Sequence, residues 1–122
     1  MAAYTTIDDP TAFFQAKTYT GNGSTQSITL NGLNNMQPDW VWIKQRDETR
    51  GHNIQDSVRG ATKYIDSRST GAEATVANTL TAFDANGFSL GSYDDVNKSS
   101  QTYVAWNWKA GTSVSGTTTG SG

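Results

Sequence analysis

The stretch Trp-Val-Trp-Ile at residues 40–43 and the stretch Trp-Asn-Trp at residues 106–108 hold all four tryptophans of the chain. Side chains two residues apart share one face of a β-strand, whereas on a helix they point about 200° apart. Valine, isoleucine and tryptophan also favour strands. The sequence therefore predicts two strands, one near the middle and one near the end, that close a single β core.

The tryptophans themselves are predicted to lie in that core. Val41 and Ile43 oppose the indoles, so both faces of the first strand are apolar and the strand is expected to be central. Large apolar side chains are usually buried. We therefore expect Trp40, Trp42 and Trp106 to be core residues. The alternative is an exposed aromatic platform on which sugars could stack.

Length and composition fit one β domain. The chain has 122 residues and a mass of 13.1 kDa, with 34% hydrophobic and 16% charged residues. Much of its polarity comes from Thr, Ser, Asn and Gly, which favours strands and turns over helices. The predicted fold class is all-β: an antiparallel two-sheet sandwich, with jelly-roll and lectin/SPRY-like arrangements as the candidate topologies.

Three parts are expected along the chain: an N-terminal arm at 1–16, a β-sandwich at 17–110 and a Gly/Ser/Thr-rich tail or linker at 111–122. In the arm, Asp9 as cap and Pro10 at the first helical position predict a short helix. The arm is too short to form a core of its own, so its apolar side chains are expected to bind a partner. These candidate partner-binding residues are Tyr4, Ile7, Phe13 and Phe14.

Turn chemistry predicts two hairpins in the body. The first joins residues 17–20 to 25–30 through Gly-Asn-Gly-Ser at 21–24. The second joins residues 79–83 to 88–90 through Asp-Ala-Asn-Gly at 84–87.

Charge and hydropathy argue against two classes of partner. A net charge of -2 and a pI near 5.1 give no basic patch for nucleic acid. The longest wholly apolar run, residues 40–43, falls far short of the roughly 18 residues of a membrane-spanning helix. The acidic start is unlike a signal peptide, so synthesis in the cytoplasm is expected.

With no cysteine, disulfides and thiolate metal sites are excluded.

No catalytic or metal-binding constellation is predicted, and no cofactor is expected. His52 is the only histidine, and Asp56 and Ser57, four and five residues away on a strand, would not converge on it. The run Asp84-x-Asn86-Gly87 starts like a calcium loop but lacks the later acidic ligand, so it is interpreted as a tight turn.

Five ordered blocks carry a family resemblance. They are Lys-Thr-Tyr-Thr-Gly-Asn-Gly-Ser-Thr-Gln-Ser-Ile at 17–28, Pro-Asp-Trp-Val-Trp-Ile-Lys at 38–44, Asp-Ser-Val-Arg-Gly-Ala-Thr-Lys at 56–63, Leu-Thr-Ala-Phe-Asp-Ala-Asn-Gly-Phe-Ser-Leu-Gly at 80–91 and Tyr-Val-Ala-Trp-Asn-Trp-Lys-Ala-Gly at 103–111. Together these resemble a β-rich N-terminal domain of tail-fibre and other virion structural proteins of tailed phages, many of them marine. The resemblance also implies that a Cys often stands where this chain has Asn107.

The resemblance implies a non-enzymatic structural and assembly module of a phage virion, most readily a tail fibre or tail-associated protein that anchors to other virion subunits. A homo-oligomer is expected, a trimer if the protein is a fibre, and the location is the virion. The alternatives are a glycan-binding adhesin that attaches to the host surface and a capsid decoration protein. An enzyme such as a depolymerase ranks behind them.

Overall fold

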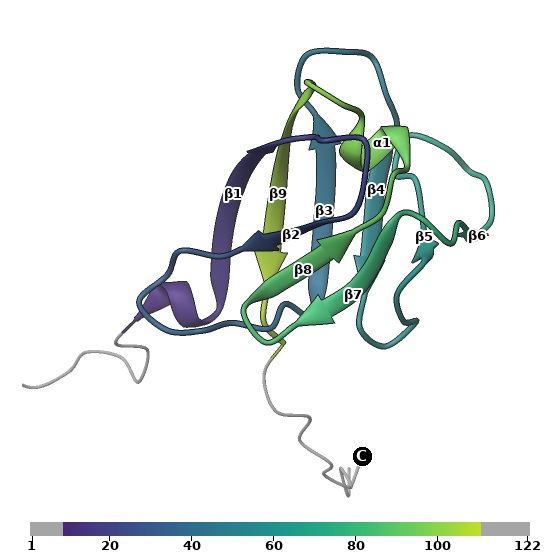
Figure 1. Ribbon diagram of the computed structural model, residues 1–122. Helices are drawn as coiled ribbons and strands as arrows, with labels where there is room; N and C mark the ends of the chain where they lie inside the picture. Colours follow the sequence, from purple (N-terminus) through teal and green to yellow (C-terminus); the bar gives the residue numbers. More distant parts are fainter. Residues whose placement is uncertain (1–8, 111–122) are drawn as a thin grey trace, which may run out of the picture.

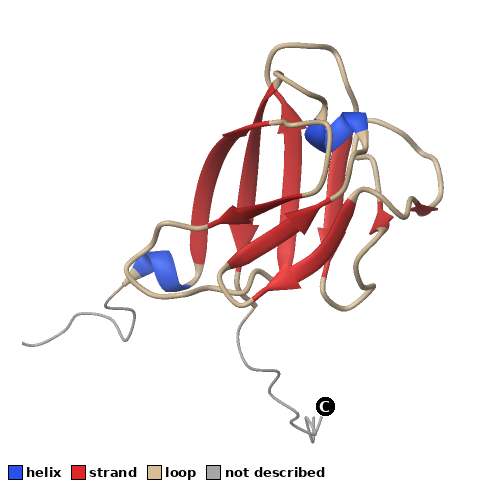
Figure 2. Cartoon of the chain, in the orientation of Figure 1, coloured by secondary structure: helices blue, strands red, loops and turns tan. Residues whose placement is uncertain are grey.

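The computed structural model describes residues 9–110, and in them two antiparallel β-sheets pack face to face (Figures 1 and 2). The four-stranded sheet has the order β1 (Phe14–Thr20), β9 (Thr102–Trp108), β3 (Trp40–Gln45) and β4 (His52–Asp56). The three-stranded sheet has the order β2 (Gln26–Thr29), β8 (Gly87–Leu90) and β7 (Leu80–Asp84). A short ribbon of β5 (Lys63–Tyr64) and β6 (Ala74–Thr75) lies beside β4. The predicted all-β antiparallel sandwich is confirmed.

The core lies between the two sheets. One face of each strand points inward, because successive side chains alternate across a strand. The short helix α1 (Asp94–Asn97) closes one end of the core with Val96. The buried core side chains are Ile28, Val41, Ile43, Leu80, Phe88, Leu90, Val96, Tyr103 and Ala105. Full burial stabilises each of the larger ones by about 1.5 to 3 kcal/mol.

The second predicted hairpin is confirmed. Strands β7 and β8 pair antiparallel, with Asp84 opposite Gly87. Gly87 has φ +133°, a conformation that other residues rarely adopt, and a Cβ there would overlap the carbonyl oxygen of Ile28 on β2. Gly87 is therefore required both by the turn and by the close approach of β2.

The first predicted hairpin is wrong, because β1 and β2 lie in different sheets. The Gly-rich turn between them binds Asn97 of α1 instead of closing a ladder. Asn97 Oδ1 accepts from the backbone N–H of Asn22 at 3.0 Å, and the carbonyl of Asn97 accepts from Gly23 N at 2.8 Å. These bonds hold the segment in which the chain passes from one sheet to the other.

The predicted N-terminal arm at residues 1–16 needs correction, both in its helix and in where it ends. Asp9 does cap a helical turn, because its Oδ1 accepts from the backbone N–H of Thr11 at 2.9 Å, but the turn is only the 3-10 segment η1 (Pro10–Ala12). Strand β1 then begins at Phe14, inside the predicted arm of residues 1–16. Tyr4, Ile7 and the tail at 111–122 lie outside the described residues.

Two tyrosines tie α1 to the four-stranded sheet. The rings of Tyr19 and Tyr103 stack with centroids 5.2 Å apart. The Tyr103 hydroxyl donates to the carbonyl of Asp94 at 2.7 Å and accepts from the backbone N–H of Lys98 at 2.9 Å. Burial raises the pKa of Tyr103 to about 12. The neutral phenol is therefore the form that fits this position.

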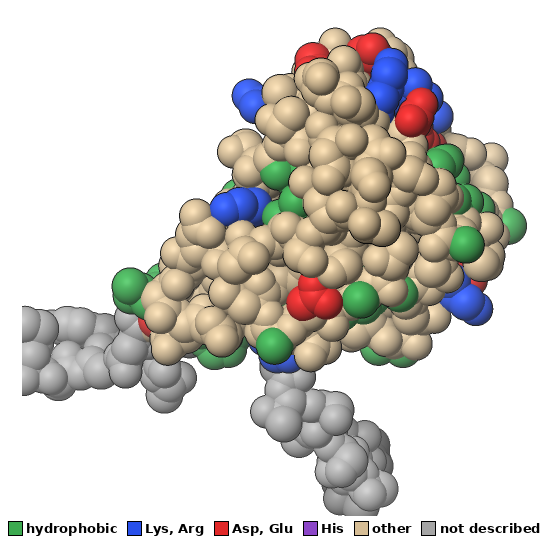
Figure 3. Space-filling model, viewed as in Figure 1, with side chains coloured by type: hydrophobic (Ala, Val, Ile, Leu, Met, Phe, Trp, Pro, Cys, Tyr) green, Lys and Arg blue, Asp and Glu red, His purple; other side chains and the backbone are tan. Residues whose placement is uncertain are grey.

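The exposed side of the three-stranded sheet is mostly polar. Figure 3 shows that side, with scattered apolar side chains on a largely polar surface. Ser27 and Thr29 of β2 and Thr81 of β7 are exposed there, and the hydroxyls of Ser27 and Ser89 lie 3.1 Å apart. This surface is typical of a solvated sheet face.

Candidate functional site

The outer side of the four-stranded sheet has the opposite character, because its strand alternation places aromatic side chains there. In β3, Val41 and Ile43 are buried in the core, and Trp40 and Trp42 therefore point outward. The register aligns three strands: Trp108 lies between Phe14 and Trp40. We call this surface the aromatic face; it comprises Phe14, Trp40, Trp42, His52, Trp106 and Trp108.

The rings of the aromatic face form one continuous chain of contacts. Phe14 and Trp108 have centroids 5.0 Å apart, and Trp108 and Trp40 are 4.5 Å apart. Trp40 then contacts Trp42 at 6.0 Å, and Trp42 contacts Trp106 at 5.6 Å. The planes are inclined by 42° to 65°, within the tilted and edge-to-face geometries that aromatic pairs prefer. The rings thus brace one another into a fixed surface.

The prediction that Trp40, Trp42 and Trp106 are core residues is wrong. All three are half-buried and lie on the side of the sheet that faces away from the core. The space between the sheets is filled by smaller chains from the same strands, such as Val41 and Ala105. The indoles contact one another, and a part of each remains exposed on the outer side of the sheet.

His52 holds one edge of the aromatic face. Its Nδ1 accepts a hydrogen bond of 2.8 Å from the indole Nε1 of Trp42, and the two rings lie 5.5 Å apart. An imidazole nitrogen that accepts carries no proton. His52 therefore holds the Trp42 ring in position at the edge of the face.

Charged groups at the rim are already paired. Asp39 lies 3.3 Å from Lys109 Nζ and accepts from the Ser57 hydroxyl at 3.0 Å and from the Ala110 N–H at 2.9 Å. Partial burial would raise the pKa of Asp39, but these hydrogen bonds together hold it below its ordinary value. The negative charge of Asp39 at this end of the face is thus neutralised by groups of the same domain.

The other rim carries a second ion pair. Asp56 lies opposite Trp40 in the register and binds both the guanidinium and the backbone N–H of Arg59. Arg59 also reaches Glu73 at 3.2 Å. Partial burial would raise the pKa of Asp56, yet the bonds from Arg59 lower it overall. The centre of the aromatic face therefore lies between paired charges.

The four predicted partner-binding residues fare differently. Phe14 belongs to the aromatic face and is 41% exposed, whereas Phe13 ends η1 and is 43% exposed. Tyr4 and Ile7 lie outside the described residues. Sequence reasoning missed that Trp108 and His52 join the same surface. The sequence could have indicated Trp108, because it lies two residues after Trp106 and therefore shares a strand face with it.

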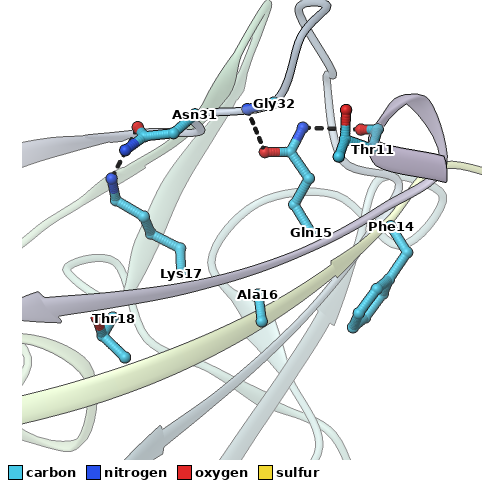
Figure 4. Close-up of a pocket in the computed structure, with 8 residues that line it drawn as sticks. All are labelled: Thr11, Phe14, Gln15, Ala16, Lys17, Thr18, Asn31 and Gly32. Carbon is cyan, nitrogen blue, oxygen red and sulfur yellow. Dashed lines mark hydrogen bonds between the residues drawn. The ribbon is translucent and has the colours of Figure 1, made fainter. Parts of the chain in front are cut away.

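A groove of about 490 Å³ runs along β1 beside the aromatic face (Figure 4). Gln15 and Lys17 reach across to the opposite loop: Gln15 Oε1 accepts from Gly32 N at 2.8 Å, and Lys17 Nζ donates to Asn31 Oδ1 at 2.9 Å. Phe14 points to the other side of the strand. The groove is thus bounded by a sheet edge and by a loop tied to it.

Two kinds of feature are absent from the part of the chain that the structure describes. Within 9–110, no group of three or more His, Asp or Glu side chains is placed to hold a metal ion. No helix in the same range is long and apolar enough to cross a membrane.

Residues 9–122 match a family model described as Domain of unknown function (DUF7483). The chain belongs to this family. No curated protein and no solved structure matches the DUF7483 chain. The match begins at Asp9, the cap of η1, and covers every strand from β1 to β9. The aromatic face and the groove therefore both lie inside the DUF7483 domain.

Proposed function

We propose that this DUF7483 domain is a non-enzymatic structural module of a tailed-phage particle, part of a tail fibre or tail-associated protein, and that its aromatic face binds another virion subunit. The observation that carries the proposal is the chain of five aromatic rings from Phe14 to Trp106 on one outer sheet face. The five sequence blocks that resemble phage virion proteins support the assignment to a phage particle.

The chemistry of the aromatic face suits a protein partner. Protein interfaces are enriched in tryptophan and depleted of charge at their centre, with polar groups at the rim. Here Asp39 and Asp56 are paired with Lys109 and Arg59 at the rim, so neither carboxylate would be desolvated as a lone charge when a partner covers the centre. The polar opposite face of the sandwich lacks these features. A docked partner would thus cover only one side of the domain.

A glycan-binding adhesin is the second candidate, because the tryptophans lie on the surface and not in the core. A sugar stacks best on a ring whose face is open. In this domain the indoles lean against one another at 42° and 65°, and the neighbouring carboxylates are engaged in ion pairs. These two features favour a protein partner over a sugar.

The test compares substitutions on and off the aromatic face. Phe14→Ala and Trp106→Ala remove side chains from the face, whereas Val58→Ala and Leu33→Ala remove exposed apolar side chains elsewhere, at 94% and 86% exposure. Each variant is introduced into the phage genome, and its copy number per particle is measured by quantitative mass spectrometry. We expect the first pair to be depleted and the second pair to be incorporated at the wild-type level.

The purified variants separate the two functions. All four should keep a cooperative melt, which rules out misfolding as the cause of depletion. If Trp106→Ala is incorporated normally but loses a bacterial surface glycan on an array, the domain is an adhesin. If neither incorporation nor glycan binding changes, the aromatic face is not the functional surface.

A further inference from the structure

Strand β1 is an open edge of the four-stranded sheet. Its bonds to β9 are fixed at both ends: Phe13 O accepts from Lys109 N at 2.8 Å, and Gly21 N donates to Gln101 O at 2.8 Å. Because such bonds alternate along an antiparallel pair, the N–H and C=O groups of Phe14, Ala16 and Thr18 point away from β9. Within residues 9–110, no backbone or side-chain group binds them.

The other sheet edges are shorter, distorted or covered. Ile54 of β4 exchanges two hydrogen bonds of 3.0 Å with Ile65, which covers that edge. Strand β7 has an irregular register between Leu80 and Ala82, and β2 has only four residues. Irregularity, shortness and covering are the usual protections of an edge strand.

Strand β1 is neither short nor irregular, and the loop at Asn31 and Gly32 is tied to the inward side chains of Gln15 and Lys17, not to the outward backbone groups of the strand. It runs for seven residues with no proline and in unbroken register with β9. Its one charged residue, Lys17, points inward, as charges that protect an edge often do, but its ammonium group is bound to Asn31 Oδ1 on the neighbouring loop. The groove along its free side is open to an added strand. Edges of this kind add strands readily.

We propose that β1 pairs antiparallel with β1 of a second copy of this chain, across a two-fold axis, and joins the two four-stranded sheets into one. The outward groups fix the register. With the axis at Ala16, this residue faces Ala16 of the second copy and Phe14 faces Thr18 of the second copy. Each such pair exchanges two backbone hydrogen bonds.

A second copy is the favoured occupant because the edge is self-complementary. The outward donors and acceptors of one β1 match those of another, and Ala16 is small enough for close approach at the axis. The pairing also makes the two aromatic faces continuous, through Phe14 at their junction. The inference does not depend on the proposed function, since it concerns the strand edge and not the face.

The contact is small. One strand edge buries less than the roughly 800 Å² per partner of a standard protein interface. The dimer should therefore form and dissociate with protein concentration. It also differs from the trimer implied by the resemblance to phage fibres, and the mass from sedimentation equilibrium distinguishes the two.

Amide hydrogen exchange followed by NMR gives a test at single residues in the full chain. Protection of the Ala16 and Thr18 amides should rise with protein concentration, while Gln15, Lys17 and Tyr19, which bond to β9, stay protected throughout. Fast exchange of Ala16 and Thr18 at every concentration would overturn the proposal. Protection at every concentration that disappears when residues 2–8 are deleted would overturn it in favour of the N-terminal segment as the added strand.

Substitutions test the same edge by sedimentation. Thr18→Pro removes an outward donor without touching the β9 ladder, and Thr18→Lys adds a charge at the junction; both should give monomers. Thr18→Val keeps the donor and should dimerise like the wild type. If Thr18→Pro fails to fold, Thr18→Lys decides. Dimers that survive Thr18→Lys but are lost in Trp106→Ala would assign self-association to the aromatic face and contradict the edge pairing.

Discussion

The indole Nε1 of Trp42 and the Nδ1 of His52 are joined by a hydrogen bond of 2.8 Å across β3 and β4. The bond adds a direction to an indole that is also held by its contacts with Trp40 and Trp106. Because both groups are half-buried, an unpaired indole N–H can turn to water. The pair therefore shapes the aromatic face more than it stabilises the fold.

Replacing His52 should show this small effect on stability. We expect His52→Ala to lower the free energy of unfolding by about 0.5 to 1.5 kcal/mol, the usual net value of one hydrogen bond. Urea denaturation followed by circular dichroism measures it, with His52→Gln as the variant that keeps an acceptor. A loss above about 3 kcal/mol would mean that His52 belongs to the structural core.

Two phenylalanines distinguish the core between the sheets from the aromatic face. Phe88 is fully buried between the sheets, whereas Phe14 is 41% exposed on the aromatic face. Phe88→Ala should cost about 3 to 5 kcal/mol, the usual cost of truncating a buried aromatic residue. Phe14→Ala should cost about 1 kcal/mol, because much of its ring is already in water. Equal losses in chemical denaturation would contradict the assignment of the faces.

Acid should weaken the fold through Asp56. The bonds from Arg59 outweigh partial burial and hold the pKa of Asp56 below that of the unfolded chain, about 3.9 for an Asp. This contribution to stability is present above about pH 4 and is lost as the pH falls through the lower folded pKa. Asp56→Asn should flatten the fall of the unfolding free energy between about pH 5 and pH 3. Identical pH profiles for variant and wild type would show that the pair contributes nothing.

High pH should lower the stability of the fold through the ionisation of Tyr103. Burial raises its folded pKa to about 12, above the value near 10 of an unfolded tyrosine. The neutral phenol therefore contributes stability below about pH 10, and this is lost as the pH rises toward 12. Tyr103→Phe should show less alkaline loss, but at neutral pH it should be less stable by about 1 to 3 kcal/mol, because Asp94 C=O and Lys98 N–H lose their partner. Calorimetric melts from pH 7 to pH 11 measure both effects.

The sequence was enough to predict the strands but not which face of them is buried. Trp-Val-Trp-Ile at 40–43 is apolar on both sides, so its alternation cannot say which side faces the other sheet. In β9, the usual rule that apolar side chains face the core would give the wrong answer. Asn107 is buried, while Trp106 and Trp108 face outward. The Nδ2 of Asn107 donates to the carbonyls of Gln15 and Ala105, whereas its Oδ1 has no hydrogen-bond partner within residues 9–110. The bond to Gln15 joins residues 92 positions apart and leaves no trace in local composition.

The false hairpin has a similar cause. Gly-Asn-Gly-Ser at 21–24 has the chemistry of a tight turn, which the sequence shows, but its partner is Asn97, more than 70 residues further along. Nothing local marks Asn97 as the residue that connects the sheets. By contrast, the hairpin of β7 and β8 depends on a neighbouring Gly87 and was predicted correctly.

The central claim is that another virion subunit covers the aromatic face, and a cryo-electron microscopy map of the intact particle that carries this chain tests it most directly. The account predicts a neighbouring subunit packed against Trp40, Trp42, Trp106 and Trp108, with the polar side of the three-stranded sheet facing solvent. A particle in which those four indoles face solvent, while neighbouring subunits contact the chain elsewhere, would contradict it.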